Sequence, residues 1–318
     1  MFKYFVKRIL QSIPLLLLTS LIVFSLIQIA PFDAIDAITT PDMSIERVEF
    51  LKQKHGLDQP FLIQYFIWLK NILQGDFGHS IITHHPISQE LATRIPNTIK
   101  LILPAYVTAL IIGIPLGLFS ASHRGKWIDD TIDGVLSLGI SVPTFWIAMI
   151  FIYFFGLKLR WVPTIGMHTI GKEGSLLDFL HHFILPYSIL VLVLMPGIAR
   201  YVRATAINQL QEDYIQVQKS LGSKRKEIFS RHVSRNTLLP IITSIGMDLP
   251  MLVTGAIISE RIFAWPGVGP YLMDATRKMD YPVIMAIMML SAILVILGNL
   301  LADIMYSMID PRIRRGQS

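Results

Sequence analysis

The sequence predicts an all-α membrane protein with six transmembrane helices. Apolar residues make up 53% of its 318 positions, charged residues only 16%, and the mean hydropathy is +0.55. This composition is typical of a polytopic membrane protein rather than of a soluble domain. Six apolar stretches are long enough to cross a hydrocarbon core about 30 Å thick at about 1.5 Å per helical residue. They are residues 9–30, 99–121, 131–157, 183–202, 238–260 and 283–307.

The charge pattern predicts how the chain lies in the membrane. The net charge is +6, but the basic residues flank the apolar stretches and form no face with interleaved aromatic residues, which disfavours a nucleic-acid partner. With a cytosolic N-terminus, more than half of the 28 lysines and arginines face the cytosol. An even number of spans then places both termini there. We expect a multi-pass protein of the cell (cytoplasmic) membrane with no nucleic-acid partner.

The N-terminal third is expected to hold one span and one outer segment. Residues 1–30 contain an apolar stretch without a small-residue cleavage site, so we interpret them as a retained transmembrane helix. Residues 31–98 are too polar to span and are expected on the extracytoplasmic side. Within them, residues 44–55 and 61–73 predict two short helices, with Ser44 as the N-cap of the first.

The remaining five spans belong to residues 99–318, which we expect to form the core domain. Prolines and glycines in these spans weaken backbone hydrogen bonds, which lipid tolerates mainly where helices or a cavity cover the break. Gly113 and Gly117 have the spacing of a close helix contact. Trp161 and Trp265 near outer span ends, like Trp127 near an inner one, are expected to anchor the membrane interface.

A polar cytosolic loop, residues 203–237, separates two of the spans. Tyr214, Val217 and Leu221 recur at helical spacing, and Gly222 stands where a helix C-cap belongs. A short exposed helix that ends at a glycine is a rigid projection, which favours docking on another protein. The alternative is an amphipathic segment that lies on anionic lipid, because the loop is also basic.

The ends of the loop helices can be assigned from capping preferences. We expect Asp213 to cap the first helix and Ser223 to start a second one, which continues through Lys224-Arg225-Lys226-Glu227.

One acidic residue falls near the middle of a predicted span. An unpaired carboxylate at the depth of Asp248 costs about 3 kcal/mol, so it should face a cavity or a partner. It either attracts a substrate ammonium or cation, or it makes a structural hydrogen bond to Ser244 or to a neighbouring helix. Pro250 favours a helix break beside it. Ser244, Asp248 and Met251 are therefore our candidates for the translocation pathway.

The sequence offers no catalytic constellation. It has no cysteine, which excludes thiolate metal sites and cysteine nucleophiles, and it has no G-x-S-x-G or H-E-x-x-H motif. Histidines gather in the predicted outer segments and could bind a transition metal, but solvated loop histidines are the favoured interpretation, so no metal site is expected. They are His55, His79, His84, His85, His168, His181 and His182.

The loop from Glu212 to Gly222 resembles the EAA loop of ABC importer permeases, and nearly the whole chain is similar to the dipeptide/oligopeptide/nickel permease family. The resemblance is carried by motifs in a fixed order. They are Lys7-Arg8, His55-Gly56-Leu57-Asp58-Gln59-Pro60, Gly75-Asp76-Phe77-Gly78-His79-Ser80, Pro96-Asn97-Thr98, Val142-Pro143, Arg235-Asn236, Leu239-Pro240, Glu260-Arg261-Ile262-Phe263-Ala264-Trp265-Pro266-Gly267-Val268-Gly269, Asp280-Tyr281-Pro282, Asp303-Ile304-Met305-Tyr306 and Asp310-Pro311-Arg312.

The resemblance implies a type I importer permease fold with a cytosolic coupling helix. Two homologous permeases would enclose the pathway, two ATP-binding subunits would each receive one loop helix, and an extracytoplasmic solute-binding protein would deliver the solute. ATP and Mg would bind to the partner subunits, with no cofactor on this chain, which would be a transport subunit and no enzyme. The coupling residues implied are Asp213, Tyr214, Gln216, Val217, Gln218, Leu221 and Gly222.

The chain departs from the family pattern at two places. Gln216, Val217 and Gln218 replace the glutamate and two alanines of the general EAA pattern, and Asp248 stands where relatives commonly show an uncharged polar residue. The first hypothesis is an importer of short peptides or peptide-like solutes. The alternatives are a permease for nickel or a metal chelate, and a membrane-embedded hydrolase that would use Asp248 and His232.

Overall fold

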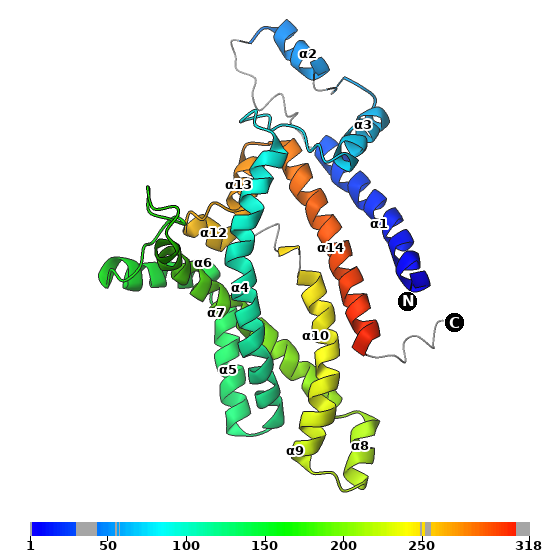
Figure 1. Cartoon of the computed structure of the whole chain (residues 1–318), viewed down its shortest axis with the longest axis vertical. Coiled ribbons are helices and arrows are strands. Elements are labelled where there is room, and N and C mark those ends of the chain that lie inside the picture. Colours follow the sequence, from blue (N-terminus) through cyan, green and yellow to red (C-terminus); the bar gives the residue numbers. More distant parts are fainter. Residues whose placement is uncertain are drawn as a thin grey trace.

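A computed structural model describes residues 2–29, 43–54, 56, 58–248, 250–251 and 256–309 of the chain. Within these ranges the chain forms helices and turns without a β-strand, and one isolated antiparallel bridge joins His79 to Pro86. The all-α fold class is confirmed. The short helices α2 and α3 lie at one end of the molecule and α8 and α9 at the other (Figure 1).

Helices occupy each of the six predicted spans. They are α1 (Phe2–Gln28), α4 (Ile87–Ser122), α5 (Trp127–Ser141) with α6 (Thr144–Phe151) and the π-helix η1 (Ile152–Lys158), α7 (Leu176–Gln209), α10 (Ser234–Asp248), and α14 (Tyr281–Ile309). By length and composition, α4, α7 and residues Tyr281–Ala302 of α14 can each cross a membrane alone. The pair α5 and α6–η1 can form a fourth crossing if it counts as one span.

Two of the predicted spans are not single continuous helices, and Pro250, beside which a break was expected, lies in a turn after α10. The span at 131–157 bends by 91° between α5 and α6. Pro143 causes the bend, because proline restricts the preceding residue to extended conformations, and Val142 has φ −84° and ψ 125°. In the span at 238–260, α10 ends at Asp248 and α12 comprises Ile257–Ile262, and part of the stretch between them lies outside the described residues.

Close packing of α4 against α7 forms the centre of the fold (Figure 1). A Cβ atom at Gly117 would lie 2.4 Å from the Ala199 carbonyl oxygen, and one at Gly113 would lie 3.0 Å from Ile198 Cγ2. The predicted small-residue contact is confirmed, since only glycine lets the two backbones approach so closely. Gly246 plays the same part where α10 packs on α14, with a Cβ 2.5 Å from the Gly298 carbonyl oxygen.

The segment predicted to lie outside, residues 31–98, contains the two expected short helices, α2 (Ile45–Lys54) and α3 (Phe61–Leu73). Ser44 accepts a hydrogen bond from the Arg47 amide at 3.3 Å, which confirms it as the N-cap of α2. Tyr65 of α3 and Ser20 of α1 form a buried hydroxyl pair at 2.8 Å. The first span is thereby tied to the outer segment.

Candidate functional site

The loop at residues 203–237, predicted to be cytosolic, contains the expected short helix, α8 (Asp213–Ser220), and its end at Gly222 is confirmed. Gly222 has φ +78°, and its amide donates to the Lys219 carbonyl at 3.0 Å. The Ser223 amide donates to the Gln218 carbonyl at 3.1 Å. These two bonds form a Schellman motif, in which glycine takes the left-handed conformation that other residues avoid.

The two capping assignments in the loop are wrong. Glu212 takes the N-cap position of α8 without a side-chain hydrogen bond, and Asp213 is the first helical residue. A carboxylate there still interacts favourably with the helix dipole. The second helix, α9 (Arg225–Glu227), begins after Lys224. The Ser223 hydroxyl donates to Gln218 Oε1 at 3.1 Å, so that side chain stabilises the end of α8 and not the start of α9.

The two faces of α8 differ in what they contact. Ile215 is fully buried, and it packs with the buried residues Ala121, Ala206, Ile228 and Val233. We call these five residues the loop core. They come from α8, from the ends of α4 and α7, and from η2 (Ile228–Val233). Their packing fixes α8 against three other helical elements.

The opposite face of α8 is exposed and partly apolar. The side chains of Val217 and Leu221 are 55% and 72% exposed. Tyr214 is half-buried, and its hydroxyl donates to Gln209 Oε1 at 2.8 Å. Val217 and Leu221 thus lie on the exposed face of α8, and Tyr214 lies at the edge of that face. Ile215, which seats the helix, was missed, because a single apolar residue among polar ones gives no periodic signal.

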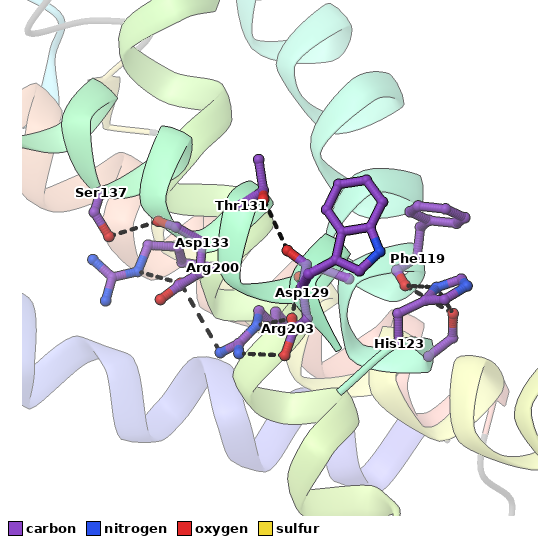
Figure 2. A network of polar contacts seen from close by, with 11 residues as sticks. Phe119, His123, Asp129, Thr131, Asp133, Ser137, Arg200 and Arg203 are labelled. Atoms are coloured by element: carbon purple, nitrogen blue, oxygen red, sulfur yellow. Dashed lines mark hydrogen bonds and ion pairs between the residues drawn. The ribbon is translucent and has the colours of Figure 1, made fainter. Parts of the chain in front are cut away.

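An ion-pair network lies beside the loop core and joins α5 to α7 (Figure 2). Arg203 of α7 donates from Nε to Asp129 Oδ1 at 2.7 Å and from Nη2 to Asp129 Oδ2 at 2.8 Å. The Ser120 hydroxyl of α4 donates to the same Oδ1 at 2.6 Å, and Asp129 is buried. Arg200 lies 3.6 Å from Asp133. A bidentate pair fixes the relative orientation of its helices more firmly than a single contact.

A further bond ties the loop itself to α4. Arg225 Nη2 donates to the Ser122 carbonyl at 3.0 Å, at the last residue of that helix. The chain of contacts from α8 therefore continues into α4 and α7, the helices at the centre of the fold.

Asp248, the carboxylate within a predicted span, is the last residue of α10 and is exposed on the surface of this chain. The Tyr106 hydroxyl of α4 donates to its Oδ2 at 2.6 Å, so the partner comes from a neighbouring helix and not from Ser244. Ser244 and Met251 are both half-buried, and Met251 packs against the buried cluster of Leu190 and Trp265. Of the three pathway candidates, Asp248 is the most open.

Glu260 was missed by the search for charged side chains within spans. It is fully buried and accepts hydrogen bonds from the Thr98 hydroxyl and the Gly269 amide, both at 2.8 Å. Gly267 is required beside it, since a Cβ there would lie 2.4 Å from Glu260 Oε2. Each oxygen of the Glu260 carboxylate accepts a hydrogen bond from within the chain. Glu260 therefore stabilises the packing at this end of the molecule.

Trp265 belongs to the same buried region, so its predicted role as an interface anchor is wrong. Its side chain is fully buried, and its Nε1 donates to the Asn97 carbonyl at 2.8 Å. Trp127 and Trp161, at 75% and 62% exposure, are free to serve as such anchors.

The histidines of the predicted outer segments do not gather at one site: His84 and His85 are exposed, whereas His182 is buried. His168 and His182 both lie beside Asp178, with Nδ1 to Oδ2 distances of 3.7 and 3.6 Å, and the Thr169 hydroxyl and amide also donate to that carboxylate. No group of three or more His, Cys, Asp or Glu side chains among the described residues is arranged to hold a metal ion. His55 lies outside the described residues.

Two family models together match most of the chain. The binding-protein-dependent transport system inner membrane component matches residues 113–315, and the N-terminal part of such membrane components matches residues 1–102. These matches, with the relatives below, exclude the hydrolase hypothesis, since the relatives are named as transport permeases. The chain is a transport subunit and not an enzyme.

Relatives of similar length include permeases of peptide and glutathione transport systems. The oligopeptide transport system permease protein AppB of Bacillus subtilis is 39% identical over 98% of both chains. A putative peptide permease protein of Brucella suis biovar 1 is 35% identical, and the glutathione transport system permease protein GsiC of Escherichia coli is 34% identical, each over 99% of both chains.

A solved structure shows the fold. A chain of the inward-facing MetNI methionine ABC transporter aligns with a TM-score of 0.50 at 16% identity, covering 69% of this chain and 96% of that one. The expected type I importer permease fold is confirmed. The chain described here belongs to the inner-membrane components of binding-protein-dependent transport systems, as an ABC importer permease of the peptide family.

Proposed function

We propose that this chain forms half of the translocation pathway of an ATP-driven importer for short peptides or peptide-like solutes, and that α8 couples it to an ATP-binding subunit. One observation carries the proposal: α8 is seated by a single buried residue, Ile215, while Val217 and Leu221 point away from the chain. Exposed apolar side chains on a fixed helix suit insertion into a groove on another protein. The residues assigned to coupling are Asp213, Tyr214, Gln216, Val217, Gln218, Leu221 and Gly222.

The contacts of α8 support a mechanical role. Movement of α8 would pass through the loop core to α4 and α7, and through η2 to α10, the helix that ends at Asp248. The bidentate Asp129–Arg203 pair would make α5 and α7 move as a unit. Rigid transmission of this kind fits a transporter in which ATP-driven closure on one side changes access on the other.

The remaining partners follow from the family. We propose a complex with a second homologous permease, two ATP-binding subunits that hold ATP and Mg, and an extracytoplasmic solute-binding protein. The chain would lie in the cytoplasmic membrane with both termini in the cytosol. Figure 1 supports this orientation, since α1 begins and α14 ends toward the side where α8 lies.

The assignment of segments of the chain to parts of the permease is also a proposal. Residues 1–30 would form the first transmembrane helix, residues 31–98 an outer segment within reach of the solute-binding protein, and residues 99–318 the permease core with the coupling loop 203–237. Ser244, Asp248 and Met251 would line the pathway. Peptide and glutathione permeases among the relatives favour peptide-like solutes over nickel or a metal chelate.

The test uses the assembled complex in proteoliposomes. Gly222→Val forces a β-branched residue into a left-handed conformation and should displace α8, so uptake of a labelled dipeptide should fall while the complex still hydrolyses ATP. Gly134→Val is the matched control, because a Cβ at either glycine meets nothing within 4 Å and Gly134 has no positive φ.

Unchanged dipeptide uptake by Gly222→Val would contradict coupling through α8. Labelled nickel, offered to the wild-type complex in parallel, should not be taken up. Nickel uptake without dipeptide uptake would replace the peptide assignment by the metal one.

A further inference from the structure

The position of Asp248 at the end of a helix inside the membrane gives that point a negative potential. The last carbonyl groups of a helix lack partners within it and carry a partial negative charge, which favours cations. Asp248 adds a carboxylate at the same point, because it is the last residue of α10. Helices that stop within the membrane commonly bind ions or charged solutes at such ends.

The charge of Asp248 is not neutralised by the described part of this chain. No Lys, Arg or His side chain in that part lies within ion-pair distance of it, and the Tyr106 hydroxyl, at 2.6 Å from Oδ2, is its hydrogen-bond donor. A phenol donor stabilises a carboxylate without cancelling its charge. The carboxylate therefore retains the capacity to bind a cation.

The surroundings favour an organic cation over a hydrated metal ion. Met247 beside Asp248 is 61% exposed, and Leu103 and Val107 on the α4 stretch that holds Tyr106 are 43% and 42% exposed. These apolar side chains offer no oxygen ligands, whereas Mg²⁺ or Ca²⁺ would require several. An ammonium group on a carbon chain suits one carboxylate, an aromatic ring and apolar neighbours.

Lipid is an unfavourable environment for Asp248. A charged carboxylate in the hydrocarbon region costs about 3 kcal/mol, which favours water, solute or another subunit beside this exposed side chain. On the proposed function, on which this inference rests, α10 borders the pathway. We propose that Asp248 and Tyr106 form a binding position for the ammonium group of the transported peptide, either its α-amino group or the side-chain amine of a lysine.

The experiment measures equilibrium binding of three labelled tripeptides to the purified complex of permeases and ATP-binding subunits, without the solute-binding protein. Ala-Ala-Ala carries only an α-ammonium group, acetyl-Ala-Lys-Ala carries only a side-chain ammonium group, and acetyl-Ala-Ala-Ala carries neither. The wild-type complex should bind at least one cationic peptide about tenfold more tightly than the neutral one. The cationic peptide that binds identifies the source of the ammonium group.

Three variants link this preference to the site. Asp248→Asn should remove the preference, Asp248→Glu should keep most of it, and Tyr106→Phe should weaken it about two- to threefold. Asp274→Asn, which changes a half-buried carboxylate of α13 (Val268–Arg277) that pairs with Arg261, should leave it unchanged. Thermal unfolding of each complex establishes that the variants are folded. If Asp248→Asn does not assemble, Asp248→Glu, which keeps the negative charge, and Tyr106→Phe remain as tests of the site.

Equal binding of all three peptides by the wild type, or an unchanged preference in Asp248→Asn, would overturn the inference. Peptide uptake by wild-type proteoliposomes would then still support the proposed function. Absence of any peptide uptake with the solute-binding protein present would overturn the proposed function itself.

Discussion

The end of the molecule near Glu260, predicted to lie outside, and the loop at residues 203–237, predicted to be cytosolic, differ in how their side chains are packed. At the outer end, Glu260, Thr98 and Trp265 are all buried, and each finds its hydrogen-bond partners within the chain. In the loop, α8 buries Ile215 and leaves Val217 and Leu221 exposed. This difference in burial indicates where to look for functional residues in the fold. Groups that are satisfied within the chain maintain the structure, whereas exposed apolar groups on a fixed helix outside the predicted spans are candidates for contact with a partner.

Removal of the Glu260 side chain should break the outer end and have the largest effect. In Glu260→Ala the Thr98 hydroxyl and the Gly269 amide lose their acceptor, and each buried donor without a partner costs about 1–3 kcal/mol. A cavity adds to the loss. We expect a much lower thermal unfolding midpoint and little folded protein in the membrane. Glu49→Ala, at an exposed position of α2, should be neutral, and equal stability of the two variants would refute the structural role of Glu260.

Truncation of the side chain that seats α8 should have the next largest effect. Ile215→Ala leaves a cavity in the loop core, for which core truncations of this kind cost about 2–5 kcal/mol. Hydrogen exchange of the amides of residues 213–220 should accelerate, while the outer end keeps its protection. If exchange rises equally at both ends, the loop core is not a separate unit.

A single methyl group at Gly222 sharpens the comparison further. Gly222→Ala meets no atom within 4 Å, so its cost is the left-handed backbone alone, about 1–2 kcal/mol. We expect local loosening of α8, measured by limited proteolysis of the loop, at unchanged global stability. Gly134→Ala lies in a helix with open space, where alanine is favoured, and should be neutral or slightly stabilising. Identical behaviour of the two variants would contradict the role assigned to the Gly222 conformation.

The smallest effect on stability is expected at Val217. Val217→Ala removes an exposed side chain and should change the free energy of unfolding by less than about 0.5 kcal/mol. Its effect should appear instead as weaker association with the ATP-binding subunit, measured by co-purification. A clear loss of stability in the isolated chain would mean that Val217 packs within it.

Local patterns were sufficient to predict the helices, the N-cap at Ser44, the helix end at Gly222 and the glycine contact of α4 with α7. Each of these depends on a few neighbouring residues or on one periodicity. The burial of Trp265 could not be predicted, because its partner Asn97 is distant in sequence and only the fold brings the two together. The same is true of Ile215, whose neighbours come from three other elements.

The broken spans show a limit of a different kind. Hydropathy measures how apolar a stretch is and not whether its backbone is continuous. By hydropathy alone, residues 131–157 and 238–260 are therefore each assigned as one span. Pro143 and Pro250 were visible as interruptions, but a proline can either kink a helix or end it, and packing decides which. The partner of Asp248, Tyr106 on α4, likewise emerged only from the arrangement of the helices.

The proposed docking of α8 can be tested directly, because the chain contains no cysteine and every engineered thiol is unique within it. Val217→Cys and Ile170→Cys, the latter at a 98% exposed position of the α6–α7 connection, would each be treated with a short thiol-to-amine cross-linker in the assembled complex. The account predicts that Val217→Cys links to the ATP-binding subunit and Ile170→Cys does not. No link from Val217→Cys, or equal links from both positions, would contradict coupling through α8.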